Sequence, residues 1–226
     1  RADAIFQAAS LTKPVIAFVA LKLVKEGKLD LSAPVSRYLP DGYAHRQNPF
    51  GGASAAKVDL VPASTLARIP VATLLNHSSG LPNWTNGTLA PKFEPGERWQ
   101  YSGEGYLLLQ AVISAAAAQD IESCVSKYVF EPLGMWHSRL RLTEDIRQQL
   151  VNGTSWLGWS RQFDFNEPNA AASLYTTAED YAKLLSALLA DTPLLSLTLA
   201  NPVATDPELG LAWGYGWGVE TAEGGP

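Results

Sequence analysis

Ser10-Leu11-Thr12-Lys13 places a serine hydroxyl three residues before a lysine amine. Positions i and i+3 share one face of a helix, so the two side chains can meet if this stretch begins a helix. A serine hydroxyl becomes an effective nucleophile only beside a base, and a desolvated lysine is such a base or assists one. The stretch therefore predicts a nucleophilic serine at the start of a helix. An ordinary helix N-cap is the competing interpretation of the same serine.

A second tetrad of the same spacing is Ser54-Ala55-Ala56-Lys57. Apolar residues at helical spacing follow Ser10, and the helix that they predict closes at Gly27. Ser54 instead lies in a glycine- and alanine-rich stretch, which is typical of a loop and would not hold a nucleophile. We therefore expect the nucleophile at Ser10 and not at Ser54.

Composition narrows the class of protein. The chain has 226 residues, of which 46% are hydrophobic, enough for one large domain or two modest ones. Its 17 basic and 22 acidic residues give a net charge of -5 with no block of like charge, so we expect neither nucleic acid nor a membrane surface as a partner. No apolar run is long enough to span a membrane. Cys124 is the only cysteine and the three histidines are far apart in sequence, so we expect no disulfide, no metal ion and no other cofactor.

Hydrophobic spacing and turn signals predict a helix-dominated chain with strand only near its C-terminal end. The predicted helices cover residues 10–27, 71–75, 104–118, 121–131, 143–151 and 178–189. Aromatic residues and valine alternate with glycine over residues 213–219. This alternation predicts a strand with small residues on one face.

Tyr101 is a candidate for proton transfer. It lies between a turn at residues 94–97 and the apolar helix predicted over 104–118, and loops held by rigid neighbours often carry catalytic groups. A serine–lysine pair needs a group that passes the proton to the leaving atom. Tyrosine titrates near pH 10, so work as a base near pH 7 requires its pKa to fall by about 3 units, which a nearby lysine ammonium would favour. An interface tyrosine without a chemical role is the alternative.

Six segments then follow one another in a familiar order over nearly the whole chain. They are FQAASLTK (6–13), LLNHSSGLP (74–82), FEPG (93–96) leading into YSG (101–103), PLGM (132–135), LYTTAED (174–180) and YGWGV (215–219). In this order they resemble the serine β-lactamase and penicillin-binding-protein superfamily, in particular its class C β-lactamase-like branch. That branch includes D-alanyl-D-alanine peptidases, β-lactamases and carboxylesterases. The resemblance implies a β-lactamase/transpeptidase-like α/β fold and a structural role for His77.

The resemblance also implies catalytic roles. Ser10 would be the acyl-accepting nucleophile, and Lys13 would hold or take its proton. Tyr101 would be the base and later the acid to the leaving group. The backbone N–H of Ser10 would form half of an oxyanion hole, which stabilises charge on the carbonyl oxygen. Ser102 and Gly103 would contact the substrate.

Two features depart from the family's pattern. The family's second motif is commonly Tyr-x-Asn, whose amide contacts the acylamino group of β-lactams and peptides, but Gly103 stands at its third position here. A substrate amide left without that partner costs about 1–3 kcal/mol. This favours an esterase, or a peptidase with another amide-binding group such as Ser102, Gln100 or Glu104, over an efficient β-lactamase. The family's third motif is not reached before Pro226, so we expect a segment, truncated at both ends, of a longer protein.

We therefore expect an α/β fold in two parts, with the active cleft at their junction. Residues 1–27 and 170–226 would form a helix-flanked antiparallel sheet, and residues 28–169 a mostly helical region. The first hypothesis is a serine hydrolase that acts through an acyl-enzyme on a small-molecule ester, a β-lactam or a D-amino-acid peptide. The alternative is a non-catalytic member or fragment that binds cell-wall peptide or a protein partner. An α/β-hydrolase is unsupported, because no G-x-S-x-G occurs.

The resemblance implies a periplasmic or secreted location and leaves a cytoplasmic one open. The sequence does not fix the substrate or the oligomeric state.

Overall fold

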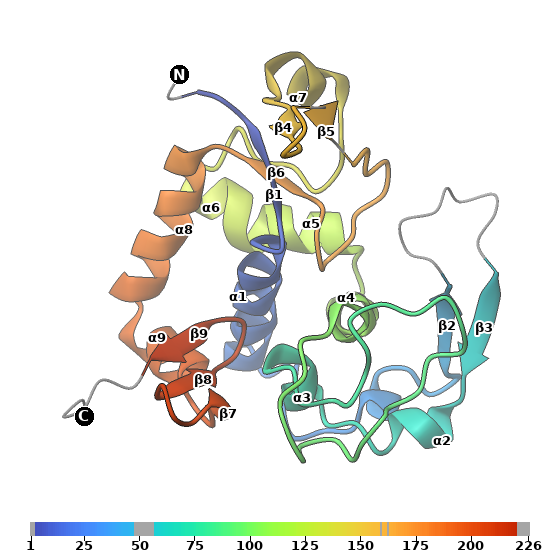
Figure 1. The fold of residues 1–226 in the computed structure, drawn as a ribbon. Helices are drawn as coiled ribbons and strands as arrows, with labels where there is room; N and C mark the ends of the chain where they lie inside the picture. Colours follow the sequence, from blue (N-terminus) through green and yellow to red (C-terminus); the bar gives the residue numbers. More distant parts are fainter. Residues whose placement is uncertain (1–2, 48–56, 159, 162, 221–226) are drawn as a thin grey trace.

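Helix α1 (Thr12–Lys25) runs through the middle of the protein with other helices around it (Figure 1). The structure, a computed structural model, describes residues 3–47, 57–158, 160–161 and 163–220. Ser54, the serine of the second tetrad, lies outside these residues. The side chains from Thr12 to Leu21 are buried without a break. A helix that is apolar nearly all round is stable only in the middle of a core, and α1 has that position.

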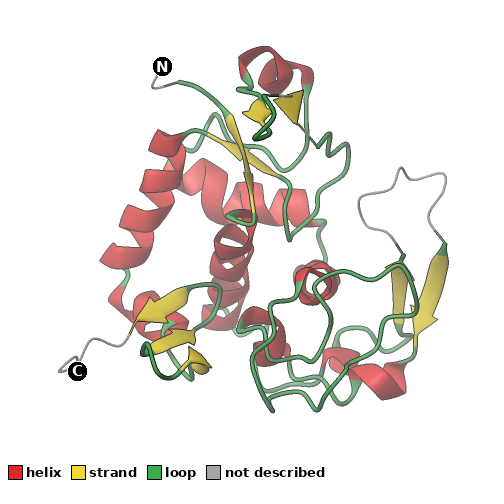
Figure 2. Ribbon diagram, in the orientation of Figure 1, coloured by secondary structure: helices red, strands yellow, loops and turns green. Residues whose placement is uncertain are grey.

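Figure 2 shows the other helices, most of which coincide with predicted ones, whereas those over residues 63–66 and 192–198 were not predicted. They are α2 (Ala63–Leu66), α3 (Val71–Leu75), α4 (Gly103–Ala117), α5 (Ile121–Val125), α6 (Glu131–Leu133), α7 (Glu144–Gln149), α8 (Ala178–Ala190) and α9 (Thr192–Thr198). A short 3-10 turn, η1, covers Val35–Arg37, and a π-helical turn, η2, covers Ser126–Phe130. The helix predicted over residues 121–131 is thus α5 continued through η2.

The strands are short and all their named pairs are antiparallel. They are β1 (Phe6–Ala9), β2 (Tyr43–Arg46), β3 (Val58–Val61), β4 (Gly153–Thr154), β5 (Ser160–Arg161), β6 (Leu174–Thr176), β7 (Val203–Asp206), β8 (Leu211–Trp213) and β9 (Gly218–Glu220). β1 pairs with β6, which brings the segment near residue 174 against the strand that leads to Ser10. The remaining sheets are β2–β3, β4–β5 and β7–β8–β9. The prediction of strand only near the C-terminal end is therefore wrong, because short strand pairs occur along the whole chain and are too brief to show a period-two pattern.

The single strand predicted over residues 213–219 is wrong. Trp213 ends β8, Gly218 begins β9, and the residues between them form a turn. Gly216 has φ +87°, and a Cβ built on it would lie 2.4 Å from Cβ of Ala17 in α1. Glycine is needed there for both conformation and space, so the alternation in sequence reflects close packing of a turn on α1 rather than the two faces of a strand.

One large apolar core joins both halves of the chain. It contains α1 together with buried side chains of α3, α4, α8 and α9. A smaller cluster of Ile5, Leu142, Ile146 and Tyr175 lies beside it. The expected division at residues 27 and 170 stays a prediction.

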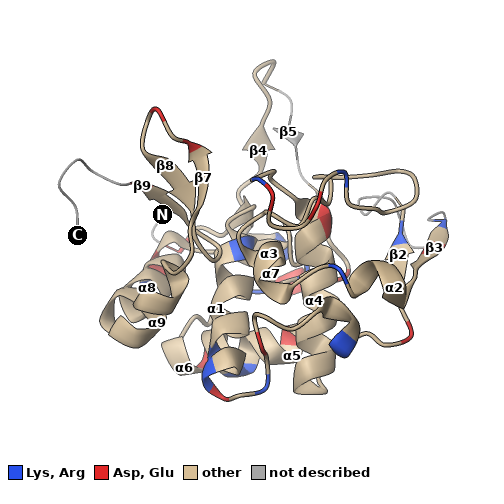
Figure 3. Ribbon diagram, turned by 90° about the horizontal axis from the view of Figure 1, so that it is seen from below, with Lys and Arg blue, Asp and Glu red and all other residues tan. Residues whose placement is uncertain are grey.

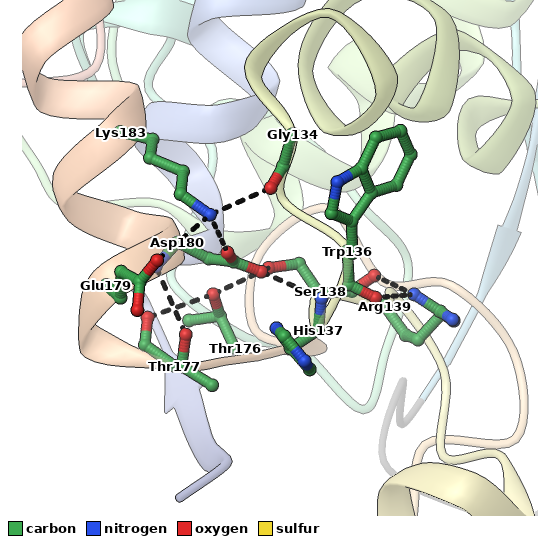
Figure 4. Close-up of polar contacts among 10 residues, drawn as sticks. All are labelled: Gly134, Trp136, His137, Ser138, Arg139, Thr176, Thr177, Glu179, Asp180 and Lys183. Carbon is green, nitrogen blue, oxygen red and sulfur yellow. Dashed lines mark hydrogen bonds and ion pairs between the residues drawn. The ribbon is translucent and has the colours of Figure 1, made fainter. Parts of the chain in front are cut away.

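A buried carboxylate fastens α8 to the turn after α6 (Figure 4). The Thr177 hydroxyl caps α8 by accepting from the Asp180 N–H at 3.1 Å. Asp180 accepts from the His137 N–H at 2.9 Å, the Ser138 hydroxyl at 3.0 Å and the Lys183 amine at 2.8 Å. These contacts supply the partners that a fully buried carboxylate needs, and they fasten the start of α8 to the turn after α6.

The charged residues are spread over the elements with both signs intermixed (Figure 3). Within the described residues, no helix is both long enough and apolar enough to cross a membrane.

Candidate active site

Ser10 follows β1 directly and is exposed to solvent. Ala9, the residue before it, has φ +46°, a conformation that side chains other than glycine rarely adopt. The Thr12 hydroxyl donates to the Ala9 carbonyl at 2.6 Å and accepts from the Leu174 N–H at 2.9 Å. The sharp turn that presents Ser10 is therefore held from both sides, by the first turn of α1 and by β6. Strained backbone that its surroundings enforce in this way is frequent at functional sites.

The Lys13 amine lies beside the Ser10 hydroxyl. Nζ is 3.2 Å from Ser10 Oγ and donates to the Ala171 carbonyl at 2.8 Å. The side chain is 1% exposed, and burial lowers the pKa of Lys13 to about 7. No carboxylate among the described residues forms an ion pair with it. A substantial fraction of Lys13 is therefore neutral near pH 7, as a proton acceptor must be.

Tyr101 completes this group. Its ring lies 4.7 Å from Lys13 Nζ, and its hydroxyl forms a side-chain hydrogen bond with Ser10. Burial raises the pKa of Tyr101, and the bond with Ser10 only partly opposes that shift. This direction is opposite to the one expected from the sequence, because burial disfavours both the phenolate and the lysine ammonium that was to stabilise it. The favoured state has a neutral amine and a protonated phenol.

The His77 ring packs against the Tyr101 ring. Its ring is fully buried with its centroid 4.4 Å from that of Tyr101, and Nδ1 accepts from the Ser102 N–H at 3.1 Å. Burial, helped by the charge of Lys13, lowers the pKa of His77 to about 3. The imidazole is thus neutral with its proton on Nε2, and it has no hydrogen-bond partner there among the described residues. The geometry is that of a group which positions the loop, in line with the structural role expected for His77.

Two tryptophans that the sequence did not single out enclose the same tyrosine. Trp99 and Trp213 have ring centroids 6.4 Å and 6.0 Å from that of Tyr101. Trp213 comes from β8, so the C-terminal hairpin forms one side of the site. In the sequence, the aromatic residues over 213–217 could have indicated this side of the site, but they were interpreted as one face of a strand.

Ser102 and Gly103 lie next to Tyr101 but serve the start of α4. The Ser102 hydroxyl accepts from the Gly105 N–H at 2.8 Å and donates to the Pro82 carbonyl at 2.9 Å. This is an N-cap, and a substrate contact would have to replace one of these bonds. Gly103 is the first residue of α4 and is buried. The structure thus brings Ser10, Lys13 and Tyr101 together, and it turns the Ser102 side chain toward the helix.

Behind α4, a buried charged cluster ties the β2–β3 hairpin to the same segment. Glu104 is fully buried, accepts from the Thr85 N–H at 3.1 Å and lies 3.2 Å from His45 Nε2. On its other side, His45 Nδ1 is 3.0 Å from Asp59. Burial raises the pKa of Glu104, so this carboxyl group takes up a proton more readily than an exposed one. Glu104, named above as a possible amide-binding group, is instead occupied with His45 and Thr85.

No group of three or more histidine, cysteine, aspartate or glutamate side chains in the described part of the chain is arranged to hold a metal ion.

Comparison with known proteins decides the family. A model described as Beta-lactamase matches residues 1–226. The chain belongs to the beta-lactamase family. This confirms the family predicted from the six ordered segments, including its relation to esterases and penicillin-binding proteins.

Relatives of this beta-lactamase family chain carry several activities in their names. It is 28% identical to Esterase EstB of Burkholderia gladioli, over 96% of the chain and 67% of EstB. It is 29% identical to Penicillin-binding protein 4* of Bacillus subtilis, over 62% of the chain and 31% of that protein. The chain therefore spans between about a third and two thirds of these two curated relatives.

Solved structures confirm the predicted fold of this family member. A class C beta lactamase superposes with a TM-score of 0.76 at 19% identity, over 96% of the chain and 60% of that structure. The D-amino acid amidase from Ochrobactrum anthropi SV3, complexed with L-phenylalanine, superposes with a TM-score of 0.74 at 27% identity, over 96% and 66%. The β-lactamase/transpeptidase-like α/β fold is thus shared across proteins with different named substrates.

Proposed function

We propose that the protein is a serine hydrolase that forms an acyl-enzyme at Ser10 from an ester or an amide. The observation that carries the proposal is the Lys13 amine, which is buried, has a pKa of about 7 and lies 3.2 Å from the Ser10 hydroxyl. A neutral amine at this distance accepts the hydroxyl proton as the oxygen attacks a carbonyl carbon.

In the acylation step, Ser10 Oγ forms a bond to the substrate carbonyl carbon and its proton passes to Lys13 Nζ. The backbone N–H of Ser10 stabilises the negative charge on the carbonyl oxygen. The tetrahedral intermediate expels the alcohol or amine, which takes a proton from the Tyr101 phenol. The Lys13 ammonium returns its proton to Tyr101, and the ester on Ser10 remains.

In the deacylation step, water takes the place of the leaving group. Its proton passes through Tyr101 and Lys13 as its oxygen bonds to the acyl carbon, and Ser10 leaves with a proton restored. Tyr101 remains a phenol between steps because burial raises its pKa. Lys13 thus acts as the base and Tyr101 as the proton relay, each in the state that burial favours.

Two findings support catalysis over simple binding of cell-wall peptide or a partner protein. Burying a lysine without a carboxylate costs stability, and a binding surface has no need of it. The turn at Ala9 holds Ser10 in an exposed position at a cost in backbone strain. Both features have a direct use in an acyl transfer reaction, as do the esterase relative and the amidase structure.

The test is covalent labelling of the complete protein with a serine-directed fluorophosphonate and with a labelled penicillin, followed by mass spectrometry of the labelled peptide. We expect the label on Ser10, and a burst of p-nitrophenol from a short-chain ester that S10A abolishes. S32A, a change at an exposed serine in the loop after α1, is the matched control and should retain the burst. Labelling at another residue, or an unchanged burst in S10A, would contradict the proposal.

A further inference from the structure

Gly103 is a glycine because another side chain fills its space. A Cβ built on Gly103 would lie 2.4 Å from Cη2 of Trp84 and 2.6 Å from Cζ2 and Cζ3. Its backbone lies outside the left-handed region that favours glycine, unlike that of Gly80 or Gly216. The tip of the Trp84 indole is therefore seated on the α-carbon of Gly103, and any larger residue at 103 would displace it.

The backbone on both sides of Trp84 is fastened to the start of α4. The Gly103 N–H donates to the Asn83 carbonyl at 3.1 Å and to Asn83 Oδ1 at 3.0 Å. The Thr85 N–H donates to the buried carboxylate of Glu104 at 3.1 Å. The residues before and after Trp84 are thus bonded to residues 103 and 104, so the indole is held in one position against Gly103.

The backbone conformation of Ser102 indicates that this indole lies on the same side of the chain as Tyr101. Ser102 is extended, with φ -137° and ψ 111°, so the side-chain directions at positions 101 and 103 are alike and that of Ser102 is opposite. Two residues span at most about 7 Å, which places the seat of the indole within the length of a short acyl chain from Tyr101. Trp84 is also partly exposed, so part of its surface is accessible.

We infer that Trp84, seated on Gly103, forms an apolar wall of the acyl pocket and selects esters of plain aliphatic or aromatic carboxylic acids over acyl groups that carry an amide. This rests on the proposed function of Ser10. An indole face gives favourable contact to hydrocarbon. An amide in the acyl group would lose its hydrogen bonds to water against the same surface, because position 103 carries no polar side chain to replace them.

The test compares two p-nitrophenyl esters of equal chain length in the complete protein, the pentanoate and the N-acetylglycinate. For each variant, kcat/KM for the pentanoate is divided by kcat/KM for the N-acetylglycinate measured on the same sample. This ratio does not depend on the fraction of folded enzyme. The variants are W84F as the conservative control, W84L, W84A, G103N and the double variant W84A/G103N. Thermal unfolding of G103A and W84A/G103A adds a readout that does not need activity.

We expect the wild type to prefer the pentanoate, after correction for the spontaneous hydrolysis of each ester. W84F should keep this preference, W84A should reduce it at least fivefold, and W84A/G103N should reduce it at least tenfold. G103N alone should lose activity toward both esters, since the new side chain collides with the indole. G103A should lower the melting temperature, and W84A/G103A should recover part of that loss.

A pentanoate preference that stays within twofold of wild type in both W84A and W84A/G103N, while hydrolysis still depends on Ser10, would overturn the inference and leave the proposed function intact. Absence of Ser10-dependent hydrolysis of both esters and of Ser10 labelling in the wild type would overturn both. A G103A variant as stable as wild type would also overturn the contact on which the inference rests.

Discussion

Lys13 and His45 are both buried basic side chains, but their surroundings differ. His45 lies between two carboxylates, with Asp59 3.0 Å from one ring nitrogen and Glu104 3.2 Å from the other. Lys13 has a hydroxyl and the Ala171 carbonyl as neighbours, and no carboxylate among the described residues pairs with it. His45 thus has an acidic neighbour at each ring nitrogen, and the Lys13 amine has none.

The difference indicates what each group does. A basic side chain held between two acidic ones joins elements, here the β2–β3 hairpin and α4. A base buried without an acid is kept near its neutral state and can accept a proton. The two sites lie at opposite ends of the segment from Tyr101 to Glu104, so one segment is anchored at one end and carries the proposed proton relay at the other.

The largest effect is expected from removing the base. K13M should lower kcat/KM for a p-nitrophenyl ester by about 10²–10⁴-fold, the usual contribution of a positioned general base. The loss is measured by steady-state kinetics, with S10A as the background rate. K22M, at a partly exposed lysine of the same helix that pairs with Asp191, is the control and should change the rate by less than about twofold. A K13M enzyme with nearly full activity would remove Lys13 from the mechanism.

Removing His45 should mainly affect stability. H45A leaves the Glu104 carboxyl buried without its partner, and we expect the free energy of unfolding to fall by about 3–5 kcal/mol. Urea unfolding followed by circular dichroism measures this. D59N should cost less than half as much, because Asp59 is 17% exposed and also accepts from Gln47. Equal losses in the two variants would show that His45 is not held mainly through Glu104.

The stability of K13M should show the opposite sign. Replacing a desolvated amine by an apolar chain should raise the free energy of unfolding by roughly 1–3 kcal/mol at pH 6, since the lost bond to Ala171 offsets part of the gain. The sign follows from the lowered pKa of Lys13, about 7 in the folded protein against 10.5 for an ordinary lysine.

Between pH 10.5 and about 7, the unfolded chain binds a proton at Lys13 that the folded protein does not, so the wild type loses stability as the pH falls. Below that range both states are protonated and the difference is constant. The advantage of K13M should therefore disappear as the pH rises toward 10.5. An advantage that is independent of pH would contradict a lowered pKa for Lys13.

The smallest effect concerns pH dependence of the rate. With Lys13 as the base, kcat/KM should rise about tenfold per unit below pH 7 and level off above the Lys13 pKa of about 7. The profile is measured from pH 5.5 to 8.5 at a wavelength where p-nitrophenol and its anion absorb equally. A profile that is still rising tenfold per unit at pH 8.5 would indicate instead that Tyr101 must lose its proton.

Much of the fold was predictable because it depends on local patterns. The apolar run after Ser10 predicts α1 within two residues at each end, and turn signals place α3 and α4 similarly. The 213–219 stretch misled because glycine alternation fits both a strand and a tight turn, and only the closeness of Ala17 to Gly216 decides between them. Periodicity carries no information on that distance.

The site was predictable in its residues and not in its electrostatics. The Ser10–Lys13 spacing is local, so their contact follows from helix geometry. The raised pKa of Tyr101 follows from burial by His77, Trp99 and Trp213, which come from three separate segments. The seat of Trp84 on Gly103 likewise joins positions that no sequence pattern relates.

The bond from Lys13 to Ala171 spans 158 residues of sequence. During synthesis, the chain reaches Ser10 and Lys13 long before it reaches the carbonyl and the strand β6 that enclose them. Until that closure, Lys13 is exposed to water, keeps the ordinary lysine pKa near 10.4 and is charged at neutral pH. The nascent chain thus carries the proposed nucleophile beside a charged lysine, and the neutral amine that the proposed reaction needs forms only when the long-range topology is complete.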